Sequence, residues 1–212
     1  MYETYERHGL KIPLELTLMD GENPIYYGRM CWQSNWLRFL LSAFSFTFGI
    51  FFFYIGETAV PVKLLSVYGT ILFLLGILFL VIAILNIYFT EYLITNYRVY
   101  IKYGLVGRKV SELKNGWITN FMVRQGIAAR FLNYGDVTFS TPGIYTGAAR
   151  MAGVMSPMGV KAIGDKVIQN FSEMQEIKNK IRKLREEYEF GRLDRERYRI
   201  LWKKYQNELK KY

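Results

Sequence analysis

Reactive and metal-binding side chains are scarce in this chain of 212 residues, which contains one cysteine, Cys31, and one histidine, His8. A single cysteine cannot form a disulfide within the chain, so Cys31 gives no indication of an oxidising compartment. A structural zinc site normally needs four cysteine or histidine ligands, and two isolated positions do not supply them. The sequence also lacks a phosphate-binding glycine loop and the pattern of a catalytic triad. We therefore predict no metal and no cofactor.

The acidic residues that an enzyme would need are scattered along the chain. Glu91, Glu112 and Asp136 have no paired base and no metal-ligand set around them in the sequence. Asp136 follows Gly135, and this pair is typical of a turn. The sequence identifies no small-molecule substrate, and we predict that the protein is not an enzyme.

Charge is missing from two long stretches and accumulates after them. Residues 1–90 hold five Lys/Arg and six Asp/Glu, a net charge of −1, whereas residues 91–212 hold 23 Lys/Arg and 12 Asp/Glu, a net charge of +11. Residues 39–56 and 64–90 contain no charged side chain. At about 1.5 Å per residue the first stretch spans roughly 27 Å, close to the ~30 Å hydrocarbon core of a bilayer. We predict two membrane-spanning helices within residues 37–89, rather than a buried helix pair or a cleaved signal peptide.

The connection between the two stretches is short, which makes them an antiparallel hairpin. Lysine and arginine are sparse in this connection and frequent on the outer flanks, which places both termini in the cytoplasm. Gly49, Gly69 and Gly76 would permit the two helices to approach closely. We expect a multi-pass protein of the cell membrane with a cytoplasmic segment at residues 1–36. Within it, residues 25–30 either pair as a strand with the domain after the hairpin or lie at the membrane interface.

Short β-type runs separated by turn residues follow the hairpin. In one of them Val99 and Ile101 alternate with Arg98 and Lys102, which predicts a strand with one buried and one basic face. We expect further strands in the runs 92–95, 108–113, 117–124, 137–141 and 151–155. One short helical turn is expected between two of them, at residues 127–132. This pattern predicts a small antiparallel β-barrel or sandwich.

A helix should follow the last strand and cover the sheet. Ser156 and Pro157 are a typical helix start, with serine as the N-cap and proline in the first turn. Val160, Ile163 and Val167 then recur at helical spacing and form an apolar stripe that should pack on the sheet.

Residues 90–113 resemble the opening strands of the pleckstrin-homology-type (PH) domain found in small bacterial and archaeal membrane proteins, where a phrase like Y-x-I-T-x-x-R-V precedes a glycine turn. Residues 132–143 are similar to the later G-Y-G-D-V-x-V segment of that family, and residues 153–157 to its closing strand and helix start. The hairpin and the D-G-E turn at residues 20–22 fit the same layout. The resemblance implies a β-barrel of seven strands or so capped by one helix, here within residues 90–175.

Residues 176–212 are highly charged and predict two helices, with Asp194 as the cap of the second. Apolar side chains recur at helical spacing on both helices. The candidates for contact with a partner helix are Ile181, Leu184, Tyr198, Leu201 and Trp202. Residues 184–198 resemble the SHOCT module, a short C-terminal two-helix unit, which implies oligomerisation or docking. Such a pair is too small to be stable alone, so its stripes should meet the barrel, a second copy, the membrane surface or a protein partner.

Two functional hypotheses follow. Arg98, Lys102, Arg108 and Lys109 lie soon after the second apolar stretch, where each cation near an anionic leaflet contributes about 1 kcal/mol. The first hypothesis is therefore a membrane-anchored, non-catalytic PH-like domain that contacts anionic lipid or a protein partner, although the same charges are also explained as a topology signal. The alternative is an assembly or scaffold protein that acts through its C-terminal helices, either as a homo-oligomer or with a protein partner. Nucleic-acid binding is not expected, because those helices interleave glutamate with lysine and arginine.

Overall fold

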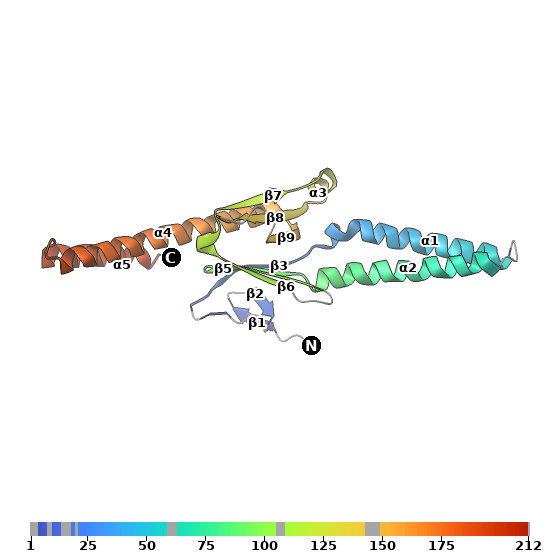
Figure 1. Cartoon of the computed structure of the whole chain (residues 1–212), viewed down its shortest axis with the longest axis horizontal. Coiled ribbons are helices and arrows are strands. Elements are labelled where there is room, and N and C mark those ends of the chain that lie inside the picture. Colours follow the sequence, from blue (N-terminus) through green and yellow to red (C-terminus); the bar gives the residue numbers. More distant parts are fainter. Residues whose placement is uncertain are drawn as a thin grey trace.

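The molecule is elongated, with a helical hairpin at one end, two β-sheets in the middle and a second helical pair at the other end (Figure 1). The predicted fold class is confirmed: the two sheets are antiparallel and pack against a long helix. The computed structural model describes residues 4–7, 10–13, 18–19, 21–58, 63–104, 109–142 and 149–211, and the structural statements below concern these residues.

The hairpin consists of helices α1 (Trp36–Thr58) and α2 (Lys63–Tyr88), and a short 3-10 helix η1 (Trp32–Asn35) leads into it. Both helices are long and apolar enough to cross a membrane. Only 22% and 11% of their most apolar windows are buried. The core helix of a soluble domain would bury most of its apolar side chains, whereas these helices present them outward. Residues 59–62 of the predicted connection lie outside the described residues.

Small side chains hold the two hairpin helices close together. A Cβ added at Gly69 would lie 2.5 Å from the backbone nitrogen of Phe53, and Gly49 likewise faces backbone atoms of the opposite helix. Nearer the domain, the hydroxyl of Ser42 donates a hydrogen bond to the carbonyl oxygen of Gly76 at 2.9 Å. The close approach predicted from the glycines is therefore confirmed, and a serine hydrogen bond accompanies it.

The first sheet joins the segment before the hairpin to the chain after it. Its order is β3-β4-β5-β6, with bounds Pro24–Arg29, Glu91–Thr95, Arg98–Tyr103 and Lys109–Lys114. Gly28 of β3 pairs with Tyr92 of β4, so of the two alternatives for residues 25–30 the structure has the strand, which ends at Arg29. The start of α1 and the end of α2 consequently both lie next to the first sheet. A separate two-stranded sheet pairs β1 (Thr4–Arg7) with β2 (Leu10–Pro13).

The second sheet has the order β7-β8-β9, with bounds Asn120–Arg124, Tyr134–Ser140 and Arg150–Met155. The 3-10 helix η2 (Asn115–Trp117) occupies the start of the run that was expected to be strand, so β7 begins later than predicted. The predicted helical turn is confirmed as α3 (Ile127–Phe131), which connects β7 to β8. The turn prediction for Asp136 is wrong: Asp136 lies inside β8 opposite Arg124, and the positive φ of the turn falls at Asn133.

The core lies between the sheets and helix α4 (Pro157–Glu189). Val99 and Ile101 of β5 are fully buried, as their alternation predicted. On α4, Val160 is 2% exposed, and Gly164 leaves room for the ring of Phe121, which a Cβ at that position would meet at 2.5 Å. The apolar stripe of α4 therefore packs on the sheets as expected.

The predicted N-terminal caps of the two C-terminal helices, α4 and α5, differ in their hydrogen bonding. Pro157 is the first residue of α4 and Ser156 occupies the N-cap position, so the predicted helix start is confirmed. Ser156 has a φ of +51°, however, and its side chain accepts no capping hydrogen bond. Asp194 does cap α5 (Arg195–Leu209), because its carboxylate accepts a hydrogen bond from the backbone N–H of Glu196 at 3.3 Å. Helix α4 runs without a break through the boundary proposed between residues 175 and 176.

Candidate functional site

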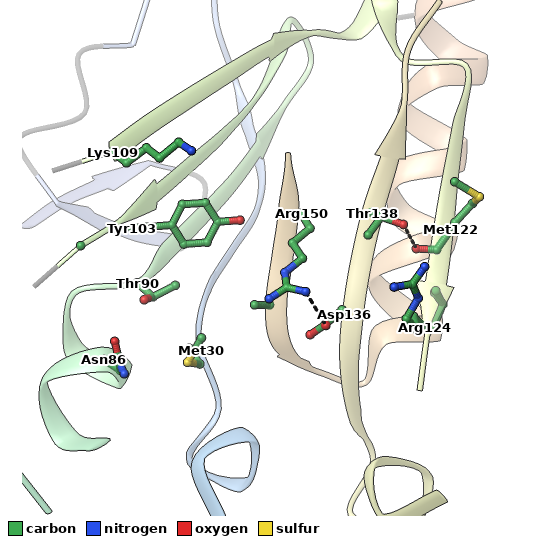
Figure 2. Close-up of a pocket in the computed structure, with 13 residues that line it drawn as sticks. Met30, Asn86, Thr90, Tyr103, Lys109, Met122, Arg124, Asp136, Thr138 and Arg150 are labelled. Atoms are coloured by element: carbon green, nitrogen blue, oxygen red, sulfur yellow. Dashed lines mark hydrogen bonds and ion pairs between the residues drawn. The ribbon is translucent and has the colours of Figure 1, made fainter. Parts of the chain in front are cut away.

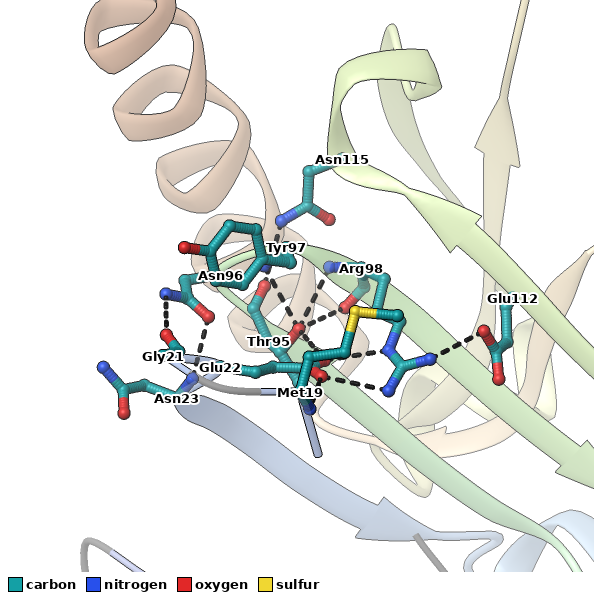
Figure 3. A network of polar contacts seen from close by, with 10 residues as sticks. All are labelled: Met19, Gly21, Glu22, Asn23, Thr95, Asn96, Tyr97, Arg98, Glu112 and Asn115. Carbon is teal, nitrogen blue, oxygen red and sulfur yellow. Dashed lines mark hydrogen bonds and ion pairs between the residues drawn. The ribbon is translucent and has the colours of Figure 1, made fainter. Parts of the chain in front are cut away.

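Arg98 lies at the start of β5, at the end of the first sheet that faces away from the hairpin. Its guanidinium donates two hydrogen bonds to the carboxylate of Glu22, at 2.9 and 3.0 Å, and a third to Glu112 at 2.8 Å (Figure 3). The Arg98 side chain is 14% exposed and the Glu22 side chain is fully buried. Arg98 is therefore engaged by two acids, and the Glu22 pair fixes the segment before β3 to the first sheet.

Glu22 is the acceptor at the centre of this network. Its carboxylate also accepts hydrogen bonds from the backbone N–H of Met19 and from the hydroxyl of Thr95, both at 2.8 Å. Burial alone would raise the pKa of Glu22, but the hydrogen bonds from Arg98, Met19 and Thr95 hold this pKa below its ordinary value. The hydrogen bond to Glu22 in turn raises the pKa of Arg98. Gly21, in the turn before Glu22, has a φ of +79°, which favours glycine.

Lys102 lies nearer the hairpin, on the same outer face of β5. Its amino group is 3.7 Å from the carboxylate of Glu91, and its side chain is only 12% exposed. Glu91 is shared with Arg29 at 3.1 Å and accepts a hydrogen bond from the hydroxyl of Tyr27 at 2.9 Å. Burial, as the largest cause, raises the pKa of Tyr27 to about 12, so this hydroxyl keeps its proton at neutral pH. The predicted basic face of β5 thus carries cations that acids from neighbouring strands neutralise.

The other two cations predicted to contact lipid, Arg108 and Lys109, are not part of this face of β5. Arg108 falls outside the described residues. Lys109 is exposed at the first residue of β6 and lines a cavity of about 790 Å³ between the two sheets (Figure 2). The structure therefore does not bring Arg98, Lys102 and Lys109 together on one surface, and lipid contact by that set stays a prediction.

The cavity between the sheets collects cations from separate parts of the chain. Lys109 lies on its first-sheet side, and Arg124 and Arg150 lie on its second-sheet side. Asn86, at the end of α2, and Thr90, which follows that helix, complete the lining next to the hairpin. The cavity is thus built where the hairpin enters the domain.

One acid accompanies the three cations. Asp136 lies 3.5 Å from the guanidinium of Arg150, and its other carboxylate oxygen accepts a hydrogen bond from the backbone N–H of Gly153 at 2.9 Å. Lys109 and Arg124 form no ion pair within the part of the chain that the structure describes. The cavity consequently has an excess of positive charge, and the planar guanidinium groups match the geometry of phosphate oxygens.

The sequence analysis missed Arg124 and Arg150 as site residues. The sequence did contain a pattern that indicates these residues, because alternate residues of a strand share a face. Thr138 of β8 lies opposite Arg150, and Asp136 lies opposite Arg124, so these polar side chains occupy one face of the second sheet. The apolar residues between them, such as Val137, are buried. What the alternation did not indicate is that the first sheet and the hairpin end would enclose this polar face.

The predicted C-terminal helical pair is confirmed, because α4 and α5 pack against each other. The expected contacts of their apolar stripes did not include this one. Leu184 of α4 is 4% exposed, and the ring of Tyr198 on α5 stacks between Tyr188 and Trp202. Of the partner-helix candidates, Leu184 is therefore buried, whereas four are half-buried: Ile181, Tyr198, Leu201 and Trp202. Contact with a further partner stays a prediction.

Comparisons with known proteins give one match. A family model described as a bacterial PH domain matches residues 41–181 of the 212-residue chain. The match includes most of the hairpin, the strands from β4 to β9 and most of α4, and it indicates no catalytic family. It ends before α5, so the resemblance of residues 184–198 to a SHOCT module stays a prediction. No curated protein and no solved structure matches the chain. The described residues contain no cluster of three or more His, Cys, Asp or Glu that would hold a metal ion.

Proposed function

We propose that this chain, which belongs to the bacterial PH domain family, is a membrane-anchored, non-catalytic protein that binds the anionic headgroup of a membrane lipid in the cavity between its sheets. The observation that carries the proposal is the position of this cavity. Three cationic side chains line it beside the end of α2, where the bilayer crossed by the hairpin would begin. A headgroup at that depth reaches the cavity without leaving its own leaflet.

The membrane anchor is supported by the dimensions and surface of the hairpin. Helices of 23 and 26 residues extend about 35 and 39 Å, enough to cross the ~30 Å hydrocarbon core with some tilt. Trp32, Trp36 and Tyr88 are exposed at the domain end of the hairpin, as in an interfacial aromatic belt. The excess of lysine and arginine on that side favours a multi-pass topology in the cell membrane with both termini in the cytoplasm.

The chemistry of the cavity favours a phosphate-bearing headgroup. The guanidinium groups of Arg124 and Arg150 and the amino group of Lys109 can donate to phosphate oxygens. Asn86 and Thr90 add neutral polar groups at the hairpin side, where a glycerol or other polar headgroup portion would lie. Each cation close to an anionic leaflet contributes about 1 kcal/mol, so the three together predict a marked preference for anionic over neutral lipid.

The test requires the full chain, because a fragment that begins at Thr90 would lack strand β3 and the buried carboxylate of Glu22. Binding of a short-chain phosphatidylglycerol and of a short-chain phosphatidylcholine to the detergent-solubilised protein would be measured by calorimetry. The variant combines Lys109→Gln, Arg124→Gln and Arg150→Gln. A matched control removes the same charge from the exposed face of α4 with Lys178→Gln, Arg182→Gln and Lys183→Gln.

We expect binding of phosphatidylglycerol only, and a loss of about tenfold to hundredfold in affinity in the cavity variant, since up to three contributions of about 1 kcal/mol disappear. The control should retain the affinity of the unmodified protein. Equal weakening in both variants would assign the effect to net charge alone, and equal affinity for the two lipids would overturn the proposal.

A second candidate function is assembly through the C-terminal helices, either as a homo-oligomer or with a protein partner. The supporting observation is that Ile200 on α5 is 67% exposed and Phe190, just after α4, is 75% exposed, although the contact between the two helices buries Leu184. Ile200→Lys and Phe190→Ser change exposed positions and should leave the fold intact. Assembly through this surface predicts that the variants shift the detergent-solubilised protein to a smaller oligomer in light scattering, whereas an unchanged mass would count against self-association there.

A further inference from the structure

We infer that helix α3 is a second membrane contact, whose exposed apolar side chains insert into the same leaflet that the hairpin crosses. The inference rests on the membrane anchor of the proposed function and is independent of headgroup binding in the cavity. It concerns the short connection between β7 and β8, which neither the hairpin nor the cavity explains.

The exposure of α3 is unusual for a domain in water. Ile127 is 84% exposed and Phe131 is 86% exposed, more than any other large apolar side chain that the structure describes. The two residues are four positions apart, so they lie on the same side of the helical turn. Leu132 follows at 43% exposure. Three adjacent apolar side chains at one loop tip indicate a contact with an apolar phase.

The position of α3 identifies that phase. Figure 1 shows α3 at the tip of the β7–β8 connection, on the side of the second sheet from which the hairpin extends. Trp36, the first residue of α1, lines the same surface hollow as Ile127 and Ala128. The apolar surface of α3 is therefore continuous with the start of a helix that the bilayer would surround.

The charges around α3 fit the interface of an anionic leaflet. Residues 124–135 contain two arginines, Arg124 and Arg130, and no acid. Arginine side chains next to an inserted apolar tip can extend to the phosphate level while the tip occupies the acyl region. The next residue, Asp136, lines the same hollow as Ile127, but its carboxylate pairs with Arg150 and accepts a hydrogen bond from the N–H of Gly153. The two arginines therefore leave an excess of positive charge beside α3.

A protein partner fits the same surface less well. A stable protein–protein interface buries about 800 Å² on each side, which requires roughly 20 or more residues. The apolar tip of α3 offers Ile127, Phe131 and Leu132, whereas a bilayer needs no complementary surface to receive three side chains. With α3 inserted in the leaflet next to the domain and both hairpin helices crossing the bilayer, the domain would have three attachment points. These would fix the orientation of the cavity relative to the lipid headgroups.

The test places an environment-sensitive fluorophore on single cysteines of the full chain in a Cys31→Ser background, reconstituted in phosphatidylcholine vesicles. The reporter positions are Phe131→Cys on α3, Phe44→Cys within α1 as the inserted reference, and Lys203→Cys on α5 as the exposed reference in water. Phosphatidylcholine carrying a spin label on its acyl chain serves as the quencher. Because the vesicles carry no net charge, headgroup binding in the cavity does not enter the measurement.

We expect quenching and a blue-shifted emission at positions 44 and 131 and neither at position 203. An additional Ile127→Ser substitution should reduce quenching at 131 and leave that at 44 unchanged, because it removes half of the inserted pair without altering a buried contact. Quenching at 44 with none at 131 would overturn the inference while the anchor stands. Absence of quenching at 44 would overturn the anchor itself, and the inference with it.

Discussion

Two groups of cations in this protein have the same chemistry and opposite surroundings. On the outer face of the first sheet, the Arg98 and Lys102 side chains are 14% and 12% exposed, and the nearby acids are Glu22, Glu91 and Glu112. In the cavity between the sheets, the Arg150 side chain is 55% exposed, and Lys109 and Arg124 are exposed and have no ion pair among the described residues. A count of basic residues therefore does not locate a basic surface. The acids contributed by other strands decide which cations remain available to a ligand.

The largest effect should come from breaking the paired group. Replacing Glu22 by glutamine leaves the largely buried Arg98 without the buried carboxylate that accepts two of its hydrogen bonds. Breaking a buried ion pair typically costs about 3 kcal/mol or more, so we expect a loss of that order in the free energy of unfolding. Denaturant unfolding of the detergent-solubilised full chain measures it, and phosphatidylglycerol affinity of the folded protein should not change.

Glu176→Gln is the matched control, because Glu176 pairs with Lys180 on the exposed face of α4. Exposed pairs contribute little, and this variant should be nearly as stable as the unmodified protein. A Glu22 variant that loses no more stability than the Glu176 variant would contradict a structural role for the network.

The same carboxylate predicts a pH dependence. Because the pKa of Glu22 is below its ordinary value of 4.5 in the folded state, the folded protein binds fewer protons than the unfolded chain as the pH falls through this range. The stability that Glu22 contributes is thus fully present above pH 4.5 and disappears as the pH falls through the lower folded pKa. The difference in unfolding free energy between the unmodified protein and Glu22→Gln should shrink at acid pH. A difference that stays constant from neutral to acid pH would contradict the lowered pKa.

A smaller effect, of opposite sign, should follow from removing the acid in the cavity. Asp136→Asn keeps an oxygen to accept from the N–H of Gly153 but no longer neutralises Arg150. We expect about fivefold tighter phosphatidylglycerol binding, equivalent to about 1 kcal/mol for one additional unpaired cation. Asp165→Asn on α4, which removes an exposed acid paired with Lys161, is the control and should leave affinity unchanged. Weaker binding in the Asp136 variant would indicate that this acid orients Arg150 for the ligand.

The smallest effect should be that of Lys102 on lipid affinity. Lys102→Gln removes a cation that Glu91 already neutralises, so we expect a change of less than about twofold, against about fivefold for Lys109→Gln. Calorimetry with the same short-chain lipid measures both. Similar losses in the two variants would remove the distinction between the paired and the unpaired cations.

Much of the local structure was predictable because it depends on neighbours in the sequence. The alternation around Val99 and Ile101 identified β5, and Asp194 marked the start of α5. The failures have local causes that only the tertiary context supplies. Ser156 follows the predicted capping pattern but has a left-handed conformation, in which its N–H donates to the carbonyl oxygen of Asn133, 23 positions earlier in the chain.

The sequence by itself determined the hairpin, the order of strands and helices after it, and the helical turn at α3, because apolar run length, alternation and turn residues act within a few positions. Only the tertiary structure decided which cations are neutralised and which line the cavity. Glu22 and Arg98 are 76 positions apart, and Lys109 and Arg150 reach one cavity from different sheets. Such pairings depend on strand register and on how the two sheets face each other, and these follow from the packing of the whole core.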